Sequence, residues 1–305
     1  MLSLMQTALE LGLISSLTVL ALYLSYTMLN VCDLSTDGAF TLGAAVGAVV
    51  AISGHPYLSI FAAMTAGVMS GLLTALLQTY MGVNSLLAGI IVNTGLYSVN
   101  IAVMGNSSLL NMNSTETIFS KAKELFSDTA FASVSRLAVI LVIIIIITAL
   151  LILFLRTRIG LALRATGNNP DMVRSSSINT NVITIIGLMI SNSFTGLSGC
   201  ILAQYNKSCN IDIGSGMLTV ALASLLIGGM FFKKKGVGFG AVGAVFGGIL
   251  FRIVYSLALR INMPAYLLKL ISSIIVVIAI SGPYLADKYK EMTMIKNNKK
   301  MMKEE

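Results

Sequence analysis

Charged residues are scarce in this chain of 305 residues, since only 10% are Asp, Glu, Lys or Arg while 56% are hydrophobic. About a quarter of the residues in a soluble domain are charged, so the composition excludes an ordinary soluble fold. The run LAVILVIIIIITALLILFL, residues 137–155, is long enough to cross the hydrocarbon core of a bilayer as one helix. The sequence therefore predicts an all-α, polytopic helical membrane protein.

Residues that carry catalysis, metal binding or redox chemistry are also few. The chain has one histidine, His55, which we interpret as a turn residue, and three cysteines, an odd number that forms no disulfide framework. The sequence has no Walker motif, no metal-ligand spacing and no nucleophile paired with a base. We therefore expect no catalytic residue, metal or cofactor in this chain. Membrane topology explains most of the net charge of +8, so we expect no nucleic-acid partner.

Hydropathy, with glycine, proline and polar clusters taken as boundaries, predicts about nine spans (eight to ten) in a single domain, residues 1–305. The predicted spans are 11–30, 38–54, 57–77, 84–105, 134–155, 182–204, 214–232, 236–257 and 264–284. The second span is short and rich in glycine and alanine. It is typical of a broken or partly re-entrant helix, which membrane proteins tolerate only where other protein or a water-filled cavity covers the backbone.

Basic residues are concentrated in three segments, 156–181, 233–235 and 285–305, which carry 13 of the 20. Loops rich in Lys and Arg stay in the cytoplasm, so we place these segments inside, including the C-terminal tail 285–305. With nine spans, the N-terminus then faces outside. The loop 106–133 is also external, and its apolar residues from Ile118 to Phe126 recur at the spacing of an amphipathic helix. That helix is either a packing lid or a docking surface.

The two halves of the chain are faintly similar. Residues 67–90 resemble residues 243–271, and the stretch from Asp33 loosely parallels the stretch from Asp212. The third and eighth spans cross in opposite directions in the predicted topology. The pattern therefore predicts an inverted internal repeat, a recurrent basis of alternating access.

The polar segment 156–181 lies between long apolar runs and contains a cappable helix. Asn169 is a favourable N-cap, Pro170 suits the first helical position, and Asp171 complements the positive end of the helix dipole. The spacing predicts a short helix from Pro170 to about Ser176. On the residues alone, this helix is either an interfacial connector or a projection that fits a partner protein.

The run from Gly160 to Gln204 resembles the signature region of ABC-importer permeases of the branched-chain amino acid type. The matching residues are Gly160, Arg164-Ala165-Thr166-Gly167-Asn168-Asn169-Pro170, Ile178-Asn179, Thr195-Gly196-Leu197-Ser198-Gly199 and Ile227-Gly228-Gly229. Ser177 departs from the pattern, because the family usually has glycine there, which puts the exit turn of the short helix in question. Residues 22–48 resemble a subgroup linked to tryptophan or tyrosine uptake in bacteria.

The resemblance implies a membrane-spanning permease subunit of an ATP-driven importer in the bacterial plasma (inner) membrane. Its solute would be a small molecule such as an aromatic or branched-chain amino acid. The implied partners are an ABC ATPase that binds ATP and Mg²⁺, an extracytoplasmic substrate-binding protein, a second copy or second permease, and membrane lipid. By the same resemblance the short helix is the coupling helix, seated in the ATPase. The implied coupling residues are Arg164, Gly167, Asn169, Pro170, Asp171, Arg174 and Ile178. Binding of Arg174 to anionic lipid is the alternative.

Polar residues inside the predicted spans are functional candidates, because each costs free energy in hydrocarbon. They are Asp33, Ser35, Thr36 and Asp37 before the short second span, Asn93 and Asn100 in the fourth, and Ser191, Asn192 and Ser193 in the sixth. Hydrogen bonding between helices or an interfacial loop is the competing explanation. The corresponding family segment lies beside the translocation path, which favours contact with the solute.

Two other functions compete with the importer. An ATP-independent secondary transporter or channel needs a coupling-ion site, and spans three to nine contain no mid-span Asp or Glu. A membrane scaffold would have an apolar, helix-packed centre without a transport path.

Overall fold

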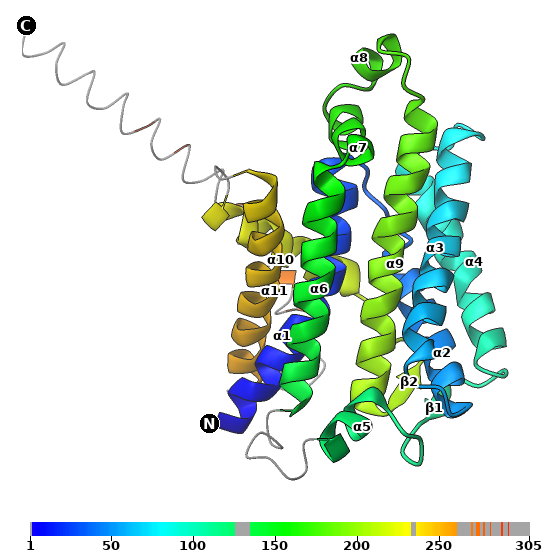
Figure 1. Ribbon diagram of the computed structural model, residues 1–305, viewed down its shortest axis with the longest axis vertical. Coiled ribbons are helices and arrows are strands. Elements are labelled where there is room, and N and C mark those ends of the chain that lie inside the picture. Colours follow the sequence, from blue (N-terminus) through cyan, green and yellow to red (C-terminus); the bar gives the residue numbers. More distant parts are fainter. Residues whose placement is uncertain are drawn as a thin grey trace, which may run out of the picture.

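The protein is a bundle of helices, seen here in a computed structural model that describes residues 2–125, 135–232 and 236–260, with isolated positions between 270 and 292 (Figure 1). Six of the described helices are long and apolar enough to cross a membrane. They are α1 (Leu2–Leu22) with its π-helical continuation η1 (Tyr23–Met28), α3 (Leu58–Thr79), α4 (Ser85–Val103), α6 (Ser135–Arg156), α9 (Thr180–Asn206) and α11 (Val237–Arg260).

Several shorter elements complete the described fold. They are α2 (Thr36–Ile52), α5 (Ile118–Leu125), α7 (Arg158–Asn168), α8 (Pro170–Ser175), α10 (Met217–Phe232) and the strands β1 (Leu109–Asn111) and β2 (Ser208–Asn210). The strands pair antiparallel, with Leu110 opposite Cys209, and join two loops far apart in sequence. This strand pair was not among the elements expected from the sequence.

The polytopic helical class predicted from composition is confirmed. The described part of the chain contains six long spans and two short apolar helices, α2 and α10, in place of eight predicted spans. The ninth predicted span, 264–284, and the tail 285–305 lie outside the continuously described residues. The inverted repeat stays a prediction.

Helix α9 is the centre of the bundle, because α1, α2 and α3 all pack against it. Glycines allow these close approaches: a Cβ on Gly43 of α2 would collide with Gly196, and a Cβ on Gly67 of α3 would collide with the carbonyl of Asn192. Small residues at helix contacts let backbones approach closely inside a bilayer. The packing explains why α9 and α1 are mostly buried, while α3, α4, α6 and α11 keep exposed apolar faces.

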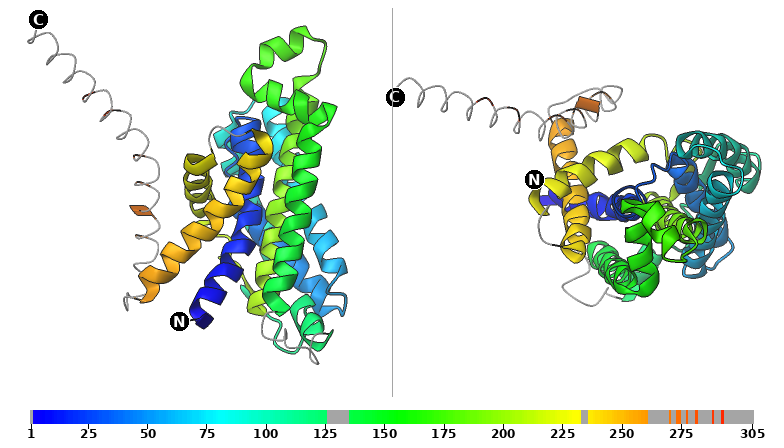
Figure 2. Two further views of the ribbon diagram at one scale, coloured as in Figure 1. Left: turned by 60° about the vertical axis from the view of Figure 1, so that its left-hand side comes forward. Right: turned by 90° about the horizontal axis from the view of Figure 1, so that it is seen from above.

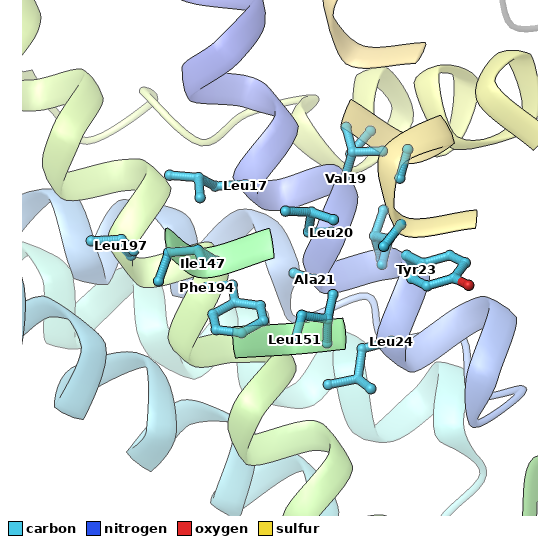
Figure 3. Packing of buried hydrophobic residues seen from close by; sticks show 14 of the residues in the cluster. Leu17, Val19, Leu20, Ala21, Tyr23, Leu24, Ile147, Leu151, Phe194 and Leu197 are labelled. Atoms are coloured by element: carbon cyan, nitrogen blue, oxygen red, sulfur yellow. The ribbon is translucent and has the colours of Figure 1, made fainter. Parts of the chain in front are cut away.

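The core between α1, α6 and α9 is made of aliphatic and aromatic side chains (Figure 3). Seven of its labelled members are Leu17 and Leu20 on α1, Leu24 on η1, Ile147 and Leu151 on α6, and Phe194 and Leu197 on α9. All seven are at most 6% exposed. This core joins the central helix to the first span.

The first span is followed by a break. After η1 the chain leaves helical geometry at Leu29, passes a left-handed residue, Asn30 (φ 58°), and starts α2 only at Thr36. Asp33 in this break bonds to Asn192, which lies near the middle of α9, so α2 begins at mid-depth in the bundle. The second helix is short, as predicted, but α2 itself is continuous from Thr36 to Ile52, and the irregular stretch precedes it.

The bundle has two different ends (Figure 1). Helices α7 and α8 project at one end, which we call the α8 end, and the N-terminus, α5 and the strand pair lie at the other, the α5 end. Figure 2 shows α10 nearly along its axis in one view and lengthwise in the view from above, so α10 runs across the bundle.

Candidate functional site

The segment 156–181 folds as predicted into a short capped helix, preceded by a second helix that was not foreseen. Thr157 caps α7 by accepting a bond from the N–H of Gly160 (3.2 Å). The Asn169 side chain caps α8 by accepting from the N–H of Met172 (3.1 Å), and Pro170 occupies the first turn. These caps satisfy backbone donors that a helix start otherwise leaves unpaired, so α8 is a defined element.

The outward face of α8 is polar with one apolar side chain. Met172 is 57% exposed, and the Asp171 side chain is 88% exposed. Val173 on the opposite face is buried. The Arg174 Nε donates to Thr180 Oγ1 (3.1 Å) at the start of α9, and its guanidinium lies 3.5 Å from the Asp171 carboxylate. Arg174 therefore ties α8 to α9 while leaving part of its charge accessible.

Two residues of the predicted coupling set lie elsewhere. Arg164 and Gly167 belong to α7 and are partly buried. A Cβ on Gly167 would collide with the carbonyl oxygen of Met28 and with Leu29, so α7 rests directly on the end of η1. Arg164 lies close enough to the Tyr23 phenol to interact with it electrostatically. These two residues face the first span, whereas Asp171 and Met172 form the projecting tip.

The backbone conformation at residue 177 explains why the family usually has glycine there. The Ser177 backbone is left-handed (φ 61°), a conformation that glycine adopts readily and other L-residues adopt at a cost. The exit turn therefore forms with serine, and Ile178, which follows it, stays 39% exposed.

Asp33 is the centre of a buried polar cluster at the break before α2. Its Oδ1 accepts from the N–H (2.8 Å) and the hydroxyl (2.6 Å) of Ser35, and its Oδ2 accepts from Asn192 Nδ2 (2.6 Å). Thr74 of α3 donates to the Ser35 hydroxyl (3.1 Å), and the Thr36 hydroxyl donates to the Asp33 carbonyl (2.8 Å). The cluster joins the break to α3 and α9.

Asp37 performs a different task one turn later. Its two carboxylate oxygens accept from the N–H groups of Gly216 (2.9 Å) and Leu218 (2.8 Å), which begin α10. A carboxylate at a helix amino end satisfies free backbone donors and complements the helix dipole. Asp37 therefore joins the start of α2 to the start of α10.

The two candidate asparagines of α4 lie on one face of the helix, and this face packs on α2. Asn100 Nδ2 donates to the Gly38 carbonyl (3.3 Å), and a Cβ on Gly38 would crowd the Asn93 side-chain oxygen. On α9, the Ser191 hydroxyl donates to the Ala21 carbonyl of α1 (2.7 Å), and Ser193 is buried. In the isolated chain these residues connect helices, and their contact with a solute stays a prediction.

Two polar groups that sequence analysis did not single out hold the α5 end together. Gln204 near the end of α9 accepts from the Ile118 N–H (3.0 Å) of α5 and donates to the Ser59 hydroxyl (2.6 Å) of α3. Glu10 of α1 is 3% exposed and accepts from the Tyr205 hydroxyl (2.7 Å). Neither shows a sequence signal, because each is one polar residue near the end of an apolar run.

A cavity of about 700 Å³ opens at the α5 end between α5, α6 and the end of α9. Lys123, Arg136 and Lys207 line it together with one acidic residue, Glu124. The excess of positive charge suits an anionic group. A docking surface or a packing lid was expected at this loop, and the described part of α5 forms one wall of the cavity.

Known proteins resemble the chain over most of its length. The family described as branched-chain amino acid transport system / permease component matches residues 4–280. A tyrosine transport system permease protein of Clostridioides difficile (strain R20291) is 32% identical over 292 residues, covering 95% of this chain and 93% of the relative.

More distant relatives are named for other solutes. The galactose/methyl galactoside import permease protein MglC of Escherichia coli (strain K12) is 23% identical, covering 70% of this chain and 63% of the relative. The guanosine ABC transporter permease protein NupQ of Bacillus subtilis (strain 168) is 27% identical, covering 75% of this chain and 70% of the relative. No solved structure matches the chain at comparable significance. The chain therefore belongs to the branched-chain amino acid transport system permease family, as the permease component of an ABC transport system.

Proposed function

We propose that the chain carries a small solute across the bacterial inner membrane by alternating access. A separate ATPase that binds α8 would drive this transport. The observation that carries this proposal is the projecting tip of the segment 156–181. Its short helix is capped at its start, tied to α9 through Arg174, and exposes Met172 and Asp171. A rigid projection with one exposed apolar side chain is suited to a socket on a partner protein.

The partner arrangement follows from the two ends of the bundle. The ATPase, which holds ATP and Mg²⁺, binds at the α8 end in the cytoplasm. A substrate-binding protein delivers the solute at the α5 end, where the cationic cavity and α5 lie. A second copy of this chain, or a second permease, completes the pathway.

We propose an aromatic amino acid as the solute. The tyrosine transport permease, which this chain matches almost end to end, supports this class. The sugar and guanosine permeases are less similar and cover less of the chain. Uptake of radiolabelled tyrosine, leucine and galactose by proteoliposomes that contain the full assembly tests the class. Accumulation of galactose rather than an amino acid would overturn it.

The coupling role is tested with a Met172→Glu variant and a matched Ser114→Glu control. Ser114 is exposed in the loop after β1 at the α5 end, so the control adds the same charge far from the tip. We expect the wild type and the control to co-purify with the ATPase and to stimulate ATP hydrolysis. Met172→Glu should fold and lose both properties. Equal binding by all three proteins would contradict the docking site.

A secondary transporter is the second candidate, and one observation favours it. Asp33 is a carboxylate buried at mid-depth, a place where coupling ions bind in such transporters. Uptake that continues with a hydrolysis-deficient ATPase, driven by an ion gradient alone, would replace the ATP-driven mechanism with this one.

A further inference from the structure

Asp33 is a buried carboxyl group that has no ion-pair partner in the described part of the chain. Its side chain is 1% exposed, and no lysine, arginine or histidine in the described part of the chain forms an ion pair with it. The amino end of α2 lies beside it and offsets about half an elementary charge. A buried ionised carboxylate without a counter-charge is costly, so the remaining charge calls for a partner.

Two buried side-chain oxygen atoms near the Asp33 cluster also lack hydrogen-bond partners in the described structure. Asn192 is fully buried and donates to Asp33 through its nitrogen, but its Oδ1 has no hydrogen-bond partner in the described structure. That oxygen is attached to the same carbon as the donating nitrogen, so it lies next to the carboxylate. A buried acceptor without a donor costs about 1–3 kcal/mol, so a ligand that bonds to this oxygen would recover that free energy.

The second orphan is the hydroxyl of Ser70 on α3, which is fully buried and unpaired in the described structure. Ser70 lies one helical turn before Thr74, which bonds to Ser35 of the cluster. It also lies between Gly67 and Gly71, which rest on the backbone of Asn192 and Leu188. Ser70 therefore lies on the side of α3 that faces α9 and the cluster.

We propose that Asp33, Asn192 and Ser70 hold a sodium-sized monovalent cation at the break before α2. The side-chain oxygens at the site are those of Asp33, Ser35, Ser70, Thr74 and Asn192. One carboxylate balances one positive charge, and carboxylate, amide and hydroxyl oxygens are the ligands that hard cations prefer. Interrupted helices at mid-membrane are known places for such ions, because unwound backbone adds carbonyl oxygens.

The bound cation would stabilise the junction of three helices. It would join the break after η1 to α3 through the Ser70 hydroxyl and to α9 through the Asn192 side-chain oxygen. Without the cation, both oxygen atoms are buried and unpaired in the described structure. This proposal does not rest on the ATPase or on the identity of the solute, because it concerns the stability of the chain itself.

The test compares the thermal midpoint of the purified chain in sodium, potassium and N-methylglucamine chloride at one ionic strength. Direct binding of ²²Na⁺ is measured in parallel. A ligand that binds only the folded state raises the midpoint, and a concentration about 100-fold above the dissociation constant should raise it by about 5 °C. We expect the midpoint to be higher in sodium than in N-methylglucamine, together with saturable ²²Na⁺ binding.

Three variants locate the site. Asp33→Asn should abolish the sodium dependence and the ²²Na⁺ binding. Ser70→Ala, which keeps the helix and removes only an unpaired hydroxyl, should weaken ²²Na⁺ binding several-fold without unfolding the chain. Asp37→Asn is the matched control, because its carboxylate oxygens already accept two backbone bonds. Asp37→Asn should be less stable and keep the full sodium dependence.

Several outcomes would overturn the proposal. One is a wild-type midpoint that is equal in all three salts. Another is a sodium effect that persists in Asp33→Asn, which would mark a general salt effect. A midpoint that depends on pH but on no cation would assign a proton to Asp33 instead. Because the readouts use the isolated chain, none depends on ATPase docking.

Discussion

Gly167 illustrates how a missing side chain determines the position of a helix. Helix α7 lies against the end of η1, and a Cβ at residue 167 would collide with the Met28 carbonyl oxygen and with Leu29. These are backbone atoms, which cannot move aside as the end of a flexible side chain can. The family motif residue therefore permits a contact between the α8 end and the first span.

Gly167→Ala should destabilise the protein by about 2 kcal/mol, because the added methyl group overpacks a contact with backbone. The thermal midpoint should fall by about 5 °C. Gly95→Ala is the control, since no atom lies within 4 Å of a Cβ at that helical position. Its midpoint should stay equal or rise, because alanine favours helix over glycine. Equal midpoints for wild type and Gly167→Ala would refute the contact.

Ser177 is the opposite case, a side chain at a position that suits glycine. Ser177→Gly should stabilise the protein by about 0.5 kcal/mol. Glycine removes the cost of the left-handed backbone, and the greater conformational entropy of glycine in the unfolded chain offsets part of this gain. Ser176→Gly is the matched control, because Ser176 has ordinary backbone (φ −86°) and should lose stability on the same change. Denaturation of both variants by heat measures the difference, and a lower midpoint for Ser177→Gly would contradict it.

Among the elements, α2 and α10 are the two short apolar helices of the described chain. Each follows an irregular stretch, and the Asp37 carboxylate bonds their starting turns together. Short helices that begin within the bundle leave their first backbone donors inside the protein, so a carboxylate partner is needed. The starts of these two helices are therefore joined through the Asp37 carboxylate.

Asp37→Ala should loosen the first turn of α10. Bonds to a charged acceptor contribute about 1.5–3 kcal/mol, so amide exchange at Gly216 and Leu218 should accelerate by roughly 30-fold. Asp212→Ala, an exposed aspartate in the preceding turn, is the control and should leave these amides protected. Hydrogen exchange read by mass spectrometry measures both, and unchanged protection in Asp37→Ala would show that the cap is dispensable.

On the scale of the whole molecule, α8 and the loop before α5 lie at opposite ends of the bundle (Figure 1). Two native cysteines, Cys200 and Cys209, are fully buried. Burial, with a smaller contribution from Cys200, raises the pKa of the Cys209 thiol to about 12. A thiol with a raised pKa stays protonated and unreactive well below that pH, so Cys209 gives little background in labelling at pH 7.5.

Exposed cysteines at the two ends should therefore report orientation. In intact cells, a membrane-impermeant maleimide should label the Ser114→Cys variant. It should label the Ser175→Cys variant only after the membrane is permeabilised. The parent chain, with its half-buried Cys32, measures the background. Raising the pH to 9 should not label Cys209. Labelling of Ser175→Cys from outside would invert the proposed topology.

The sequence by itself determined the class, most spans and the short capped helix. These follow from local chemistry: unbroken apolar runs must leave water, and Asn169 with Pro170 forms a helix start wherever it occurs. The short second helix was also visible in its glycine and alanine content. The family motif was legible for the same reason, because it is a contiguous stretch.

Only the tertiary structure decided what the polar residues do. Asp33 and Asp37 are four residues apart and look equivalent in sequence, yet one bonds to α9 and the other caps α10. The Gln204 side chain accepts a hydrogen bond from the backbone of α5, although the two residues are 86 positions apart in sequence. A polar side chain in a membrane interior takes whichever partner packing brings within bonding distance, and that partner is set by the crossing of helices, which no local pattern encodes.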